Sequence, residues 1–586
     1  MYIKYYPRRF YAVFFIFLFI FFLLIARLFF IQFFKSSYLK SIAARQHNLY
    51  VELEPRRGTI YDRKLRPQAV NVNADSLYAL PSEISDKEEV IRKLAAILKL
   101  DYAYLKDRLY RKKSFIWIAR KLSPQTVAAI KSLKLKGLDF VKESKRCYPN
   151  GFLSSHVIGF SGLDNVGLEG IELYYNNYLR GSPGCALFLR DARQRKLELW
   201  EKMILPKDGY NVISTIDEVI QYIAERELDR MIKDFHPLQA AIIVMDPHTG
   251  EILALANRPG FDLNNASSIG ENIRRDHAIC DLFEPGSVFK IVTASAAIEE
   301  KRVTETDRFF CENGSYRVAN HILHDHRPHG WLTFREVIEQ SSNIGTTKVA
   351  QKLGPDLVYR YVRLFGFGSK LGIDLPGEIS GMIKPPRAWS KTSIGAVPIG
   401  QEVGVNTLQL VSAISVIANG GLLMRPYIVK EIQDKYGEKI KEFSPVVINK
   451  VISPGTANRV KEILMGVVEN GTGKLAAVEG FRVAGKTGTG QKLDPDGRYS
   501  HTKFNASFIG FAPADDPAIA ICIIADEPHP YYFGGVVCAP VFKRVAADVL
   551  KYLEILPSAT GNQANSVRGD DFSDRTDRFH EAKKIN

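Results

Sequence analysis

Cysteine is scarce in this chain, and the six cysteines form neither a C-x-x-C pair nor a dense framework. The sequence also lacks paired RNP segments and the Cys/His spacing of zinc fingers. We therefore expect no nucleic-acid partner, although the net charge is +15 and basic residues are spread along the chain. Residues 36 to 235 contain no paired acidic motif typical of a glycosyl-transferring enzyme.

One long apolar run stands near the N-terminus. Every residue from Phe10 to Ala26 is apolar, Arg27 interrupts the run, and Leu28 to Ile31 resume it. About twenty apolar residues span a bilayer as a helix. A cleaved signal peptide would have a shorter apolar core followed by a small-x-small site, so an uncleaved transmembrane anchor over 10–34 is favoured. The basic residues within 1–9 predict a cytoplasmic N-terminus and an external bulk.

Changes in composition divide the rest of the chain, which is too long for one core. Residues 35–235 are mixed and charged, with a strand pattern at Asn48 to Leu53 and a helix pattern at Lys87 to Leu98, and are interpreted as a non-catalytic pedestal or dimerisation-type domain. Residues 236–556 form the predicted catalytic domain. The tail 557–586 lacks apolar periodicity and is predicted to be disordered.

The catalytic region has strands at both ends and helices between them. Such an order predicts an α+β fold in which an antiparallel sheet is covered by helices. The expected elements are a hairpin of strands 240–246 and 251–257, a helix beginning near residue 287, a helix over 406–419, strands from 506 and from 518, and a closing helix over 540–553.

Ser287 and Lys290 stand three residues apart at the start of an apolar helix, so their side chains share one face. Serine becomes a good nucleophile only when a base takes its proton, and lysine becomes a base only when burial or nearby cations lower its pKa. The same spacing is also typical of a solvated pair on a helix surface. The S-x-x-K motif alone therefore does not show that Ser287 is a nucleophile.

Two further motifs follow in order. Ser341 and Asn343 form S-x-N, which alone is equally typical of a helix cap, and Lys486 opens K-T-G, where an isolated lysine on a strand edge would usually be a surface residue. The segment FRVA before Lys486 is expected to be a strand that enters the site. In the order S-x-x-K, S-x-N, K-T-G, the three motifs are the signature of serine acyl-transferases that react with penicillin.

This order assigns a role to each catalytic side chain. Ser287 attacks a carbonyl, Lys290 takes its proton, and Ser341 relays that proton toward the leaving amine. Asn343 can hold Lys290 and the substrate amide. Lys486 adds positive potential, which favours the free base on Lys290 and attracts a substrate carboxylate.

The K-T-G segment predicts the substrate-binding edge. Thr487 and Thr489 can donate hydrogen bonds to a carboxylate, and Gly488 lets a substrate backbone approach the strand closely. The backbone N–H groups of Ser287 and Thr489 are expected to form the oxyanion hole. No metal or cofactor is required.

The segment GFRVAGKT at Gly480 to Thr487 formally matches the phosphate-binding loop G-x-x-x-x-G-K-[ST]. That motif requires a glycine-rich loop leading into a helix, whereas FRVA is strand-like and Gly488 to Gly490 follow it. An NTPase is therefore disfavoured.

The chain resembles the class B penicillin-binding proteins, in particular the septal, division-specific peptidoglycan transpeptidases. Length, SKRCYP at Ser144 to Pro149 and PDGRY favour the septal branch. The chain departs from the family pattern at two places. Cys147 stands where an aromatic residue is common. The segment GQEVGVNTLQL from Gly400 replaces a more glycine-rich one and is expected to affect the edge of the active-site cleft, but none of the named catalytic groups. The segments that carry the resemblance are RRGTIYDR (56–63), HVIGF (156–160), GLEGIELYYNNYLRGSPG (167–184), EPGSVFK (284–290), SSNIG (341–345), GKTGTGQK (485–492), PDGRY (495–499) and YYFGGVVCAPVFK (531–543).

The histidines of NHILHDHRPHG crowd around Asp325 and suggest a metal site. Their spacing fits no helix face with two ligands, and no H-E-x-x-H motif accompanies them. The family has a similar I-x-D and H-G pattern without metal. We therefore expect a loop in which His321, His324, His326 and His329 satisfy local hydrogen bonds.

The resemblance implies that the enzyme cross-links peptidoglycan stem peptides. Ser287 would attack the penultimate D-alanine carbonyl, expel the terminal D-alanine and pass the acyl group to an amine on a neighbouring stem. A β-lactam would copy the D-Ala-D-Ala end and leave a slowly hydrolysed acyl-enzyme. A class A bifunctional synthase and a β-lactamase are disfavoured by the missing glycosyltransferase region and by the uncleaved anchor, respectively.

The resemblance also implies a place and partners. The enzyme would sit in the inner (cytoplasmic) membrane as a single-pass protein with an external catalytic domain, and would bind a polytopic glycan polymerase and division proteins through its anchor and pedestal. Two alternatives stay open: an elongation-type transpeptidase of side-wall synthesis, and a penicillin-binding scaffold or sensor without catalytic activity.

Overall fold

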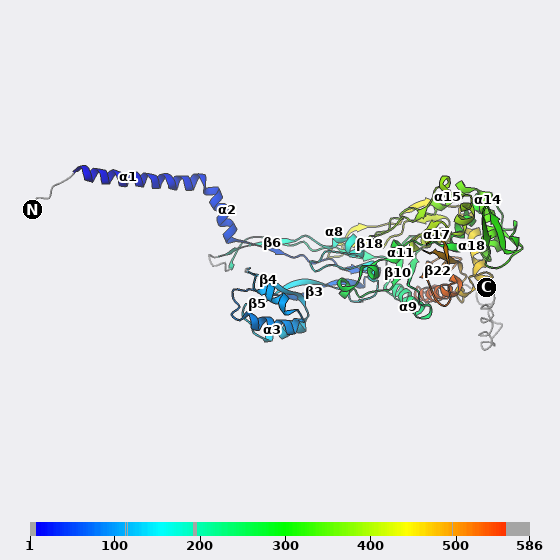
Figure 1. Ribbon diagram of the computed structural model, residues 1–586, viewed down its shortest axis with the longest axis horizontal. Helices are drawn as coiled ribbons and strands as arrows, with labels where there is room; N and C mark the ends of the chain where they lie inside the picture. Colours follow the sequence, from blue (N-terminus) through cyan, green and yellow to red (C-terminus); the bar gives the residue numbers. More distant parts are fainter. Residues whose placement is uncertain (1–6, 112, 114, 191–195, 495, 558–586) are drawn as a thin grey trace, which may run out of the picture. The chain divides into compact units, whose positions relative to one another are not determined.

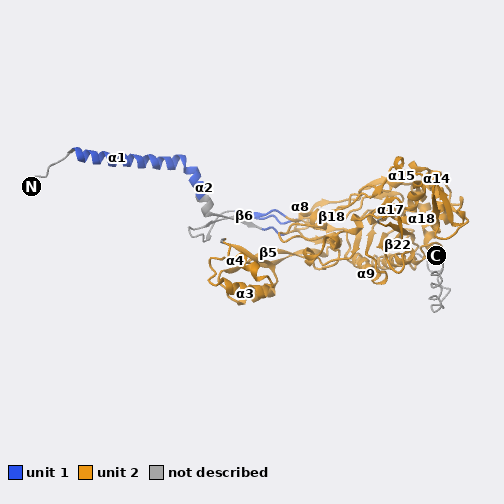
Figure 2. Ribbon diagram, viewed as in Figure 1, with its two compact units in different colours: residues 1–56, 181–209 blue, residues 57–180, 210–586 orange. Residues whose placement is uncertain are grey.

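The described residues form two compact units (Figures 1 and 2). Unit 1 lies within residues 1–56 and 181–209, and unit 2 lies within residues 57–180 and 210–586. Most of the predicted disordered tail and the first six residues of the predicted cytoplasmic segment lie outside the described residues. The computed structural model describes residues 7–557 except for 112, 114, 191–195 and 495.

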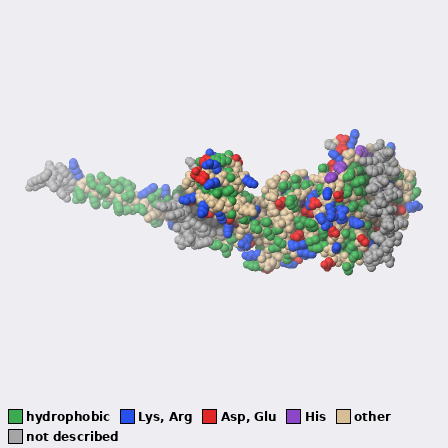
Figure 3. Space-filling model, turned by 90° about the horizontal axis from the view of Figure 1, so that it is seen from below, with side chains coloured by type: hydrophobic (Ala, Val, Ile, Leu, Met, Phe, Trp, Pro, Cys, Tyr) green, Lys and Arg blue, Asp and Glu red, His purple; other side chains and the backbone are tan. Residues whose placement is uncertain are grey.

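In unit 1, the predicted anchor is a continuous helix. Helix α1 spans Pro7–Phe29 and continues as one π-helical turn, η1, over Phe30–Phe34. Hydrophobic side chains cover α1 (Figure 3), and its span is not buried by any other described part of the chain. Among the described residues it is the single helix long and apolar enough to cross a membrane. The rest of unit 1 is α2 (Ser36–His47) and an antiparallel sheet of β1 (Asn48–Leu53), β6 (Gly184–Arg190) and β7 (Lys196–Ile204).

Unit 2 contains a seven-stranded sheet. The predicted helix over Lys87 to Leu98 is confirmed as α3, which packs with two further helices in a separate hydrophobic core against β3, β4 and β5. Asp86 caps α3 by accepting a hydrogen bond from the Glu89 N–H. The strands are β2 (Ile60–Tyr61), β3 (Pro67–Ala79), β4 (Ile116–Leu122), β5 (Leu138–Cys147), β8 (Asn211–Ser214), β18 (Val429–Gln433) and β19 (Lys439–Glu442), and the helices are α3 (Lys87–Leu98), α4 (Tyr102–Leu109) and α5 (Pro124–Ser132).

The predicted antiparallel sheet of the catalytic region has five strands in the order β10-β9-β23-β22-β21. The predicted hairpin is confirmed, because β9 and β10 pair antiparallel across a turn that Gly250 makes with a φ of +85°. Strand β21 lies at the edge of the sheet, so one of its sides is free of a neighbouring strand. The strands are β9 (Gln239–Met245), β10 (Ile252–Arg258), β21 (Ala484–Leu493), β22 (Tyr499–Ala512) and β23 (Ile519–Asp526).

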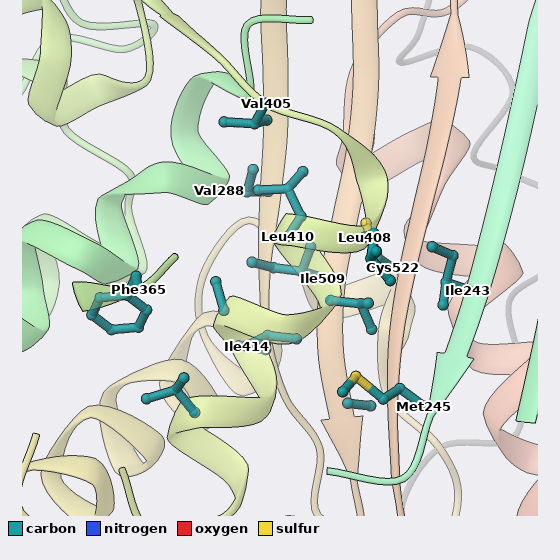
Figure 4. Close-up of a cluster of buried hydrophobic side chains, with 14 of the residues drawn as sticks. Ile243, Met245, Val288, Phe365, Val405, Leu408, Leu410, Ile414, Ile509 and Cys522 are labelled. Carbon is teal, nitrogen blue, oxygen red and sulfur yellow. The ribbon is translucent and has the colours of Figure 1, made fainter. Parts of the chain in front are cut away.

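Helices cover both faces of this sheet, as the α+β prediction requires. On one face lie α9 (Glu218–Phe235), α19 (Gly534–Val537) and α20 (Ala539–Tyr552). On the other face α17 (Thr407–Ala418) is buried along its whole length, and Leu408, Leu410 and Ile414 pack toward the sheet residues Ile243 and Ile509 (Figure 4). Asn406 and Gln409 form a capping box that begins α17 where the pattern predicted it.

The FRVA prediction is wrong in its position. Strand β21 begins only at Ala484, the last residue of FRVA, and runs through the K-T-G segment to Leu493. Val483 is buried in the hydrophobic cluster that the sheet shares with α9 and α20, and Phe481 packs against this cluster. Phe481 makes only an isolated antiparallel bridge with Val478, outside the five-stranded sheet. Strand β22 also begins earlier than predicted, at Tyr499, because its outer half pairs with the end of β21 beyond the core.

Shorter elements complete unit 2. These are α6 (Ser155–Ile158), α7 (Gly170–Tyr174), α8 (Asn176–Leu179), η2 (Leu263–Ser268), α10 (Glu271–Arg274), α11 (His277–Cys280), η3 (Gly286–Phe289), α12 (Lys290–Glu299), β11 (Arg308–Phe310), η4 (Glu312–Gly314), β12 (Ser315–Val318), β13 (His321–His324), β14 (Trp331–Thr333), α13 (Phe334–Glu339), α14 (Asn343–Leu353), α15 (Pro355–Leu364), β15 (Met382–Ile383), η5 (Pro386–Ala388), α16 (Ser393–Ala396), η6 (Val397–Ile399), β16 (Val403–Gly404), β17 (Leu422–Met424), β20 (Val447–Lys450), α18 (Pro454–Glu469) and η7 (Lys474–Ala476).

Candidate active site

Ser287 lies in a tight turn against the edge strand β21. The turn is the 3-10 helix η3, and α12 begins at Lys290, so the predicted helix starts with one tighter turn. Gly286 has a φ of +58°, and a Cβ there would lie 2.6 Å from the carbonyl oxygen of Thr489. Only glycine fits this position, which brings the Ser287 turn into close contact with β21. The Ser287 side chain is half-buried.

Lys290 is completely buried beneath this turn. Its Nζ donates hydrogen bonds to the backbone oxygen of Ser341 (2.6 Å), to Ser341 Oγ (3.2 Å) and to Asn343 Oδ1 (2.8 Å). Burial lowers the pKa of Lys290 to about 7. Since an ammonium group has three donors, these three bonds use them all. Among the described residues no hydrogen bond joins Lys290 Nζ to Ser287 Oγ.

The S-x-N motif occupies the turn between α13 and α14. Ser341 has a left-handed φ of +60°, a conformation that is strained for serine. Ser342 caps α14, because its Oγ accepts a hydrogen bond of 2.9 Å from the N–H of Gly345. The helix-cap interpretation therefore holds for Ser342, while the Ser341 and Asn343 side chains both contact Lys290.

Lys486 reaches the same point from β21. Its Nζ donates a hydrogen bond of 2.9 Å to Ser341 Oγ, and the side chain is completely buried. Burial, and then the nearby charge of Lys290, lower the pKa of Lys486 well below its usual value. The Ser341 hydroxyl therefore bridges two buried amines, which excludes the surface-lysine interpretation.

Strand β21 brings Lys486, Thr487, Gly488 and Thr489 to the sheet edge beside η3. A Cβ on Gly488 would lie 2.3 Å from Ser507 Oγ and 2.8 Å from Val288 Cγ1. The glycine is thus required by packing between the strand and the nucleophile turn, a reason that the sequence did not indicate.

Thr487 and Thr489, the residue after K-T-G, point to the side of the strand that faces α19 and residue Thr472. Thr487 Oγ1 lies 2.7 Å from Thr472 Oγ1, and Thr489 Oγ1 accepts a hydrogen bond of 3.3 Å from the N–H of Gly534. Because the Thr489 hydroxyl accepts in this bond, its own proton stays available for a ligand.

The sequence did not identify Asp325 as part of the site. Its Oδ2 accepts a hydrogen bond of 2.6 Å from Ser342 Oγ, and its Oδ1 accepts the N–H groups of Asn343 and Ile344, the latter at 3.0 Å. A carboxylate at a helix N-terminus is favoured by the free N–H groups and by the helix dipole. Asp325 therefore holds the S-x-N turn beside Lys290.

The histidines around Asp325 do not gather at one point. His321 to His324 form strand β13, paired with β12, so only His326 and His329 lie in the loop that was expected. The backbone oxygen of His324 accepts a hydrogen bond of 2.9 Å from Asn343 Nδ2, and the His326 ring lies 4.8 Å from that of Phe533. Among the described residues no group of His, Cys, Asp and Glu could hold a metal ion.

The phosphate-loop match is also explained. Lys486 stands inside β21, and the strand continues to Leu493 instead of leading into a helix. The backbone N–H groups therefore cannot form the cradle that binds a phosphate.

Two family models match the chain. A penicillin-binding protein transpeptidase domain matches residues 240–547, which is more than half of the chain, and a penicillin-binding protein dimerisation domain matches residues 52–214. The dimerisation match lies within residues 35–235, the region interpreted as non-catalytic.

Similar proteins cover nearly the whole chain. The chain is 37% identical over 540 residues to stage V sporulation protein D of Bacillus subtilis (91% of this chain, 83% of the relative). It is 31% identical over 522 residues to the peptidoglycan D,D-transpeptidase FtsI of Escherichia coli K12 (87% of this chain, 86% of the relative).

Solved structures agree with these relatives. Penicillin-binding protein 3 of Mycobacterium tuberculosis, in complex with aztreonam, has a TM-score of 0.68 and 28% identity, and the match covers 87% of this chain and 98% of that one. A peptidoglycan synthetase of Bifidobacterium adolescentis has a TM-score of 0.71 and 25% identity, with 89% and 98% covered. The chain therefore belongs to the class B penicillin-binding proteins, with their transpeptidase and dimerisation domains, and is a peptidoglycan D,D-transpeptidase.

Proposed function

We propose that this transpeptidase works through an acyl-enzyme on Ser287. One observation carries this assignment: Ser341 Oγ lies 3.2 Å from Nζ of Lys290, three residues after Ser287, and 2.9 Å from Nζ of Lys486. Ser287 Oγ attacks the penultimate D-alanine carbonyl of a stem peptide, and the peptide bond to the terminal D-alanine breaks. An amine of a second stem then attacks the ester and releases Ser287.

Protons move through the buried amines. Lys290, whose pKa of about 7 makes the free base available at neutral pH, takes the proton of Ser287. Ser341, between the two amines, passes a proton to the leaving amine of D-alanine. Lys290 and Lys486 repel one another in this dry site, so one ammonium charge is favoured over two, and the other amine is left as a base.

The edge of β21 binds the substrate. The N–H groups of Ser287 and Thr489 stabilise the oxyanion, and Lys486, Thr487 and Thr489 attract the terminal carboxylate. Asn343 orients Lys290 through its Oδ1 and has its Nδ2 bonded to the backbone of His324, so its side chain has one defined orientation. The close packing at Gly488 and Gly286 keeps the strand and the nucleophile turn at a constant separation.

Covalent labelling tests the nucleophile. The purified protein, incubated with a fluorescent penicillin, is expected to gain one label, which is absent in Ser287→Ala while the thermal unfolding curve stays that of a folded protein. Intact-mass analysis and peptide mapping should place the added mass on the peptide that contains Ser287. A label on another residue, or full labelling of Ser287→Ala, would overturn the assignment.

The biological role proposed is cross-linking at the division septum. The 31% identity to a transpeptidase named FtsI over most of both chains supports this role. The relative at 37% identity is named as a sporulation protein, which supports a sporulation role as second candidate. A fluorescent fusion would appear at midcell rings for division, in lateral patches for elongation, and only in sporulating cells for the sporulation role.

Presence of every predicted catalytic group argues against a scaffold or sensor without activity. Rescue of a depletion strain by Ser287→Ala would instead favour a scaffold.

Residues 1–9 are assigned to the cytoplasm, 10–34 to the inner membrane, 35–235 to an external pedestal and 236–556 to the external transpeptidase domain. A polytopic glycan polymerase and division proteins are the proposed partners of the anchor and pedestal, testable by co-purification from membranes.

A further inference from the structure

A short loop runs alongside the segment that precedes the nucleophile. Phe283 and Val405 exchange two backbone hydrogen bonds of 3.0 Å as an isolated antiparallel bridge. Nearer to Ser287, the N–H of Gly286 donates a hydrogen bond of 3.1 Å to the backbone oxygen of Gly400. A Cβ on Gly400 would lie 2.2 Å from the backbone oxygen of Gly286, so the two backbones touch. Residues 400–405, which depart from the family pattern, thus form one wall of the nucleophile turn.

Between these two contacts, the Glu284 carboxyl group joins three segments. Its Oε1 accepts hydrogen bonds from the N–H of Glu402 (2.9 Å) and from the phenol of Tyr499 (3.2 Å), the first residue of β22. Its Oε2 is buried and has no hydrogen-bond partner in the described part of the chain. A buried carboxyl oxygen without a partner is costly, so a glutamate at this position is unfavourable for stability alone.

Glu402 adds a second unfavourable feature at the same place. Its φ is +57°, a left-handed conformation in which glycine would be unstrained. Its carboxylate accepts a hydrogen bond of 2.6 Å from the buried Ser393 hydroxyl, and this bond holds the loop in the conformation that presents the Glu402 N–H to Glu284.

We propose that Glu284 is a positioning residue for the transpeptidation reaction, which holds the Ser287 turn between the 400–405 loop and the β21–β22 hairpin; this rests on Ser287 being the nucleophile. Glu284 also contacts β21 directly, because a Cβ on Gly490 would lie 2.3 Å from the Glu284 backbone oxygen. Movement of Glu284 would therefore change the separation of the Ser287 and Thr489 N–H groups, the two donors of the oxyanion hole. A misplacement of about 1 Å in such a site can cost about 100-fold in rate.

The bonds require an acceptor oxygen rather than a negative charge. Burial raises the pKa of Glu284 to about 7, so the neutral acid is well populated near neutral pH. Glutamine keeps the acceptor oxygen that Glu402 and Tyr499 use, and is therefore the conservative replacement. Alanine removes both bonds.

The test measures acylation of the full-length protein by a fluorescent penicillin over a range of concentrations, which separates the acylation rate constant from the dissociation constant of the initial complex. We expect Glu284→Ala to lower the rate constant about 10- to 100-fold with little change in the dissociation constant. Glu284→Gln should restore the rate to within about threefold of the parent. Tyr499→Phe, which removes one donor only, should lower the rate about fivefold.

The matched control is Tyr361→Phe. Tyr361 donates a hydrogen bond of 2.8 Å to Glu300, at the far end of α12 from Lys290, so the same chemical change is made away from the nucleophile. Its acylation rate should equal that of the parent. Thermal unfolding of each variant shows whether it is folded. If Glu284→Ala does not fold, the acylation rate of Tyr499→Phe tests the positioning role instead.

Several outcomes would overturn the positioning role. They are a parent-like rate in folded Glu284→Ala, a parent-like rate in Tyr499→Phe, a Glu284→Gln rate as low as that of Glu284→Ala, or an equal loss in Tyr361→Phe. Labelling of Ser287→Ala, measured in the same series, would instead refute the nucleophile, so the two failures can be told apart.

Discussion

Asp325 accepts a hydrogen bond of 2.6 Å from the hydroxyl of Ser342, and its other oxygen accepts the N–H groups at the start of α14. We predict that Asp325→Asn destabilises the protein by about 2–4 kcal/mol, because the new amide NH₂ cannot accept hydrogen bonds and leaves one side of this network unpaired. Acylation by penicillin should fall at least about tenfold, since Asn343 and Ser341 lose their fixed positions around Lys290.

Thermal unfolding and the acylation rate check this prediction, with Asp434→Asn as control. Asp434 also accepts two backbone N–H groups, at 2.8 Å each, but in an exposed turn. The control should change stability by less than about 1 kcal/mol and leave acylation unchanged. Equal behaviour of the two variants would contradict the role given to Asp325.

Acylation should depend on pH through Lys290. Burial lowers the pKa of this amine to about 7 from the usual 10.5, so protonated Lys290 predominates below pH 7 and the free base above it. The rate should rise about tenfold per pH unit below pH 7 and reach a plateau above it. Because the folded pKa is lowered, the contribution of Lys290 to stability is lost as pH falls from about 10.5 to about 7. A rate independent of pH between 5.5 and 8 would exclude Lys290 as the base.

Replacement of Gly488 by alanine should damage both stability and activity. The new Cβ would lie 2.3 Å from Ser507 Oγ, 2.8 Å from Val288 Cγ1 and 2.9 Å from the backbone oxygen of Pro285. We expect a loss of about 1–3 kcal/mol from overpacking and a large decrease in acylation, because β21 must move away from the nucleophile turn.

Gly455→Ala is the control for Gly488→Ala. Gly455 lies in α18, and a Cβ there would meet no atom within 4 Å, so the variant should be neutral or stabilised by up to about 1 kcal/mol. Denaturant unfolding measures both variants. Unchanged acylation in Gly488→Ala would show that the strand tolerates the methyl group, contrary to the packing described.

Lys486→Met should separate stability from activity. Lys486 is completely buried, and burial lowers its pKa well below the usual value, so an amine there costs more than an apolar side chain of similar length. We expect an unchanged or higher unfolding temperature and a loss of acylation of at least about 100-fold. The exposed Lys503→Met serves as control, and a marked fall in unfolding temperature with retained acylation would contradict the prediction.

Local sequence patterns predicted much of the secondary structure, for a physical reason that is itself local. The N-caps, glycines and apolar periods around 87–98 and 406–419 act within a few residues, and they define α3 and α17 to within one residue. The strand expected at FRVA was misplaced because β pairing depends on a partner strand: β21 starts where β22 provides one, at Ala484 opposite Phe511.

The candidate site was predicted through its motifs, and the structure brings the Lys290, Ser341, Asn343 and Lys486 side chains of these motifs together. Asp325, Thr472 and Glu284 were missed, because each acts through a hydrogen bond to a residue distant in sequence. A carboxylate placed before a predicted helix could have indicated Asp325 as an anchor, whereas the histidines around it drew attention to metal binding instead.

By itself the sequence determined the apolar N-terminal helix, the order of the three motifs and the family to which they belong, because these depend only on residue types and spacing. Only the tertiary structure decided that Lys290 and Lys486 meet at Ser341, since Ser341 stands 51 positions from Lys290 and 145 from Lys486. The lowered pKa of both lysines follows from that meeting, because desolvation arises only where separate segments pack together and exclude water. The link from Glu284 to the 400–405 loop is decided in the same way, by packing of distant backbones rather than by any local pattern.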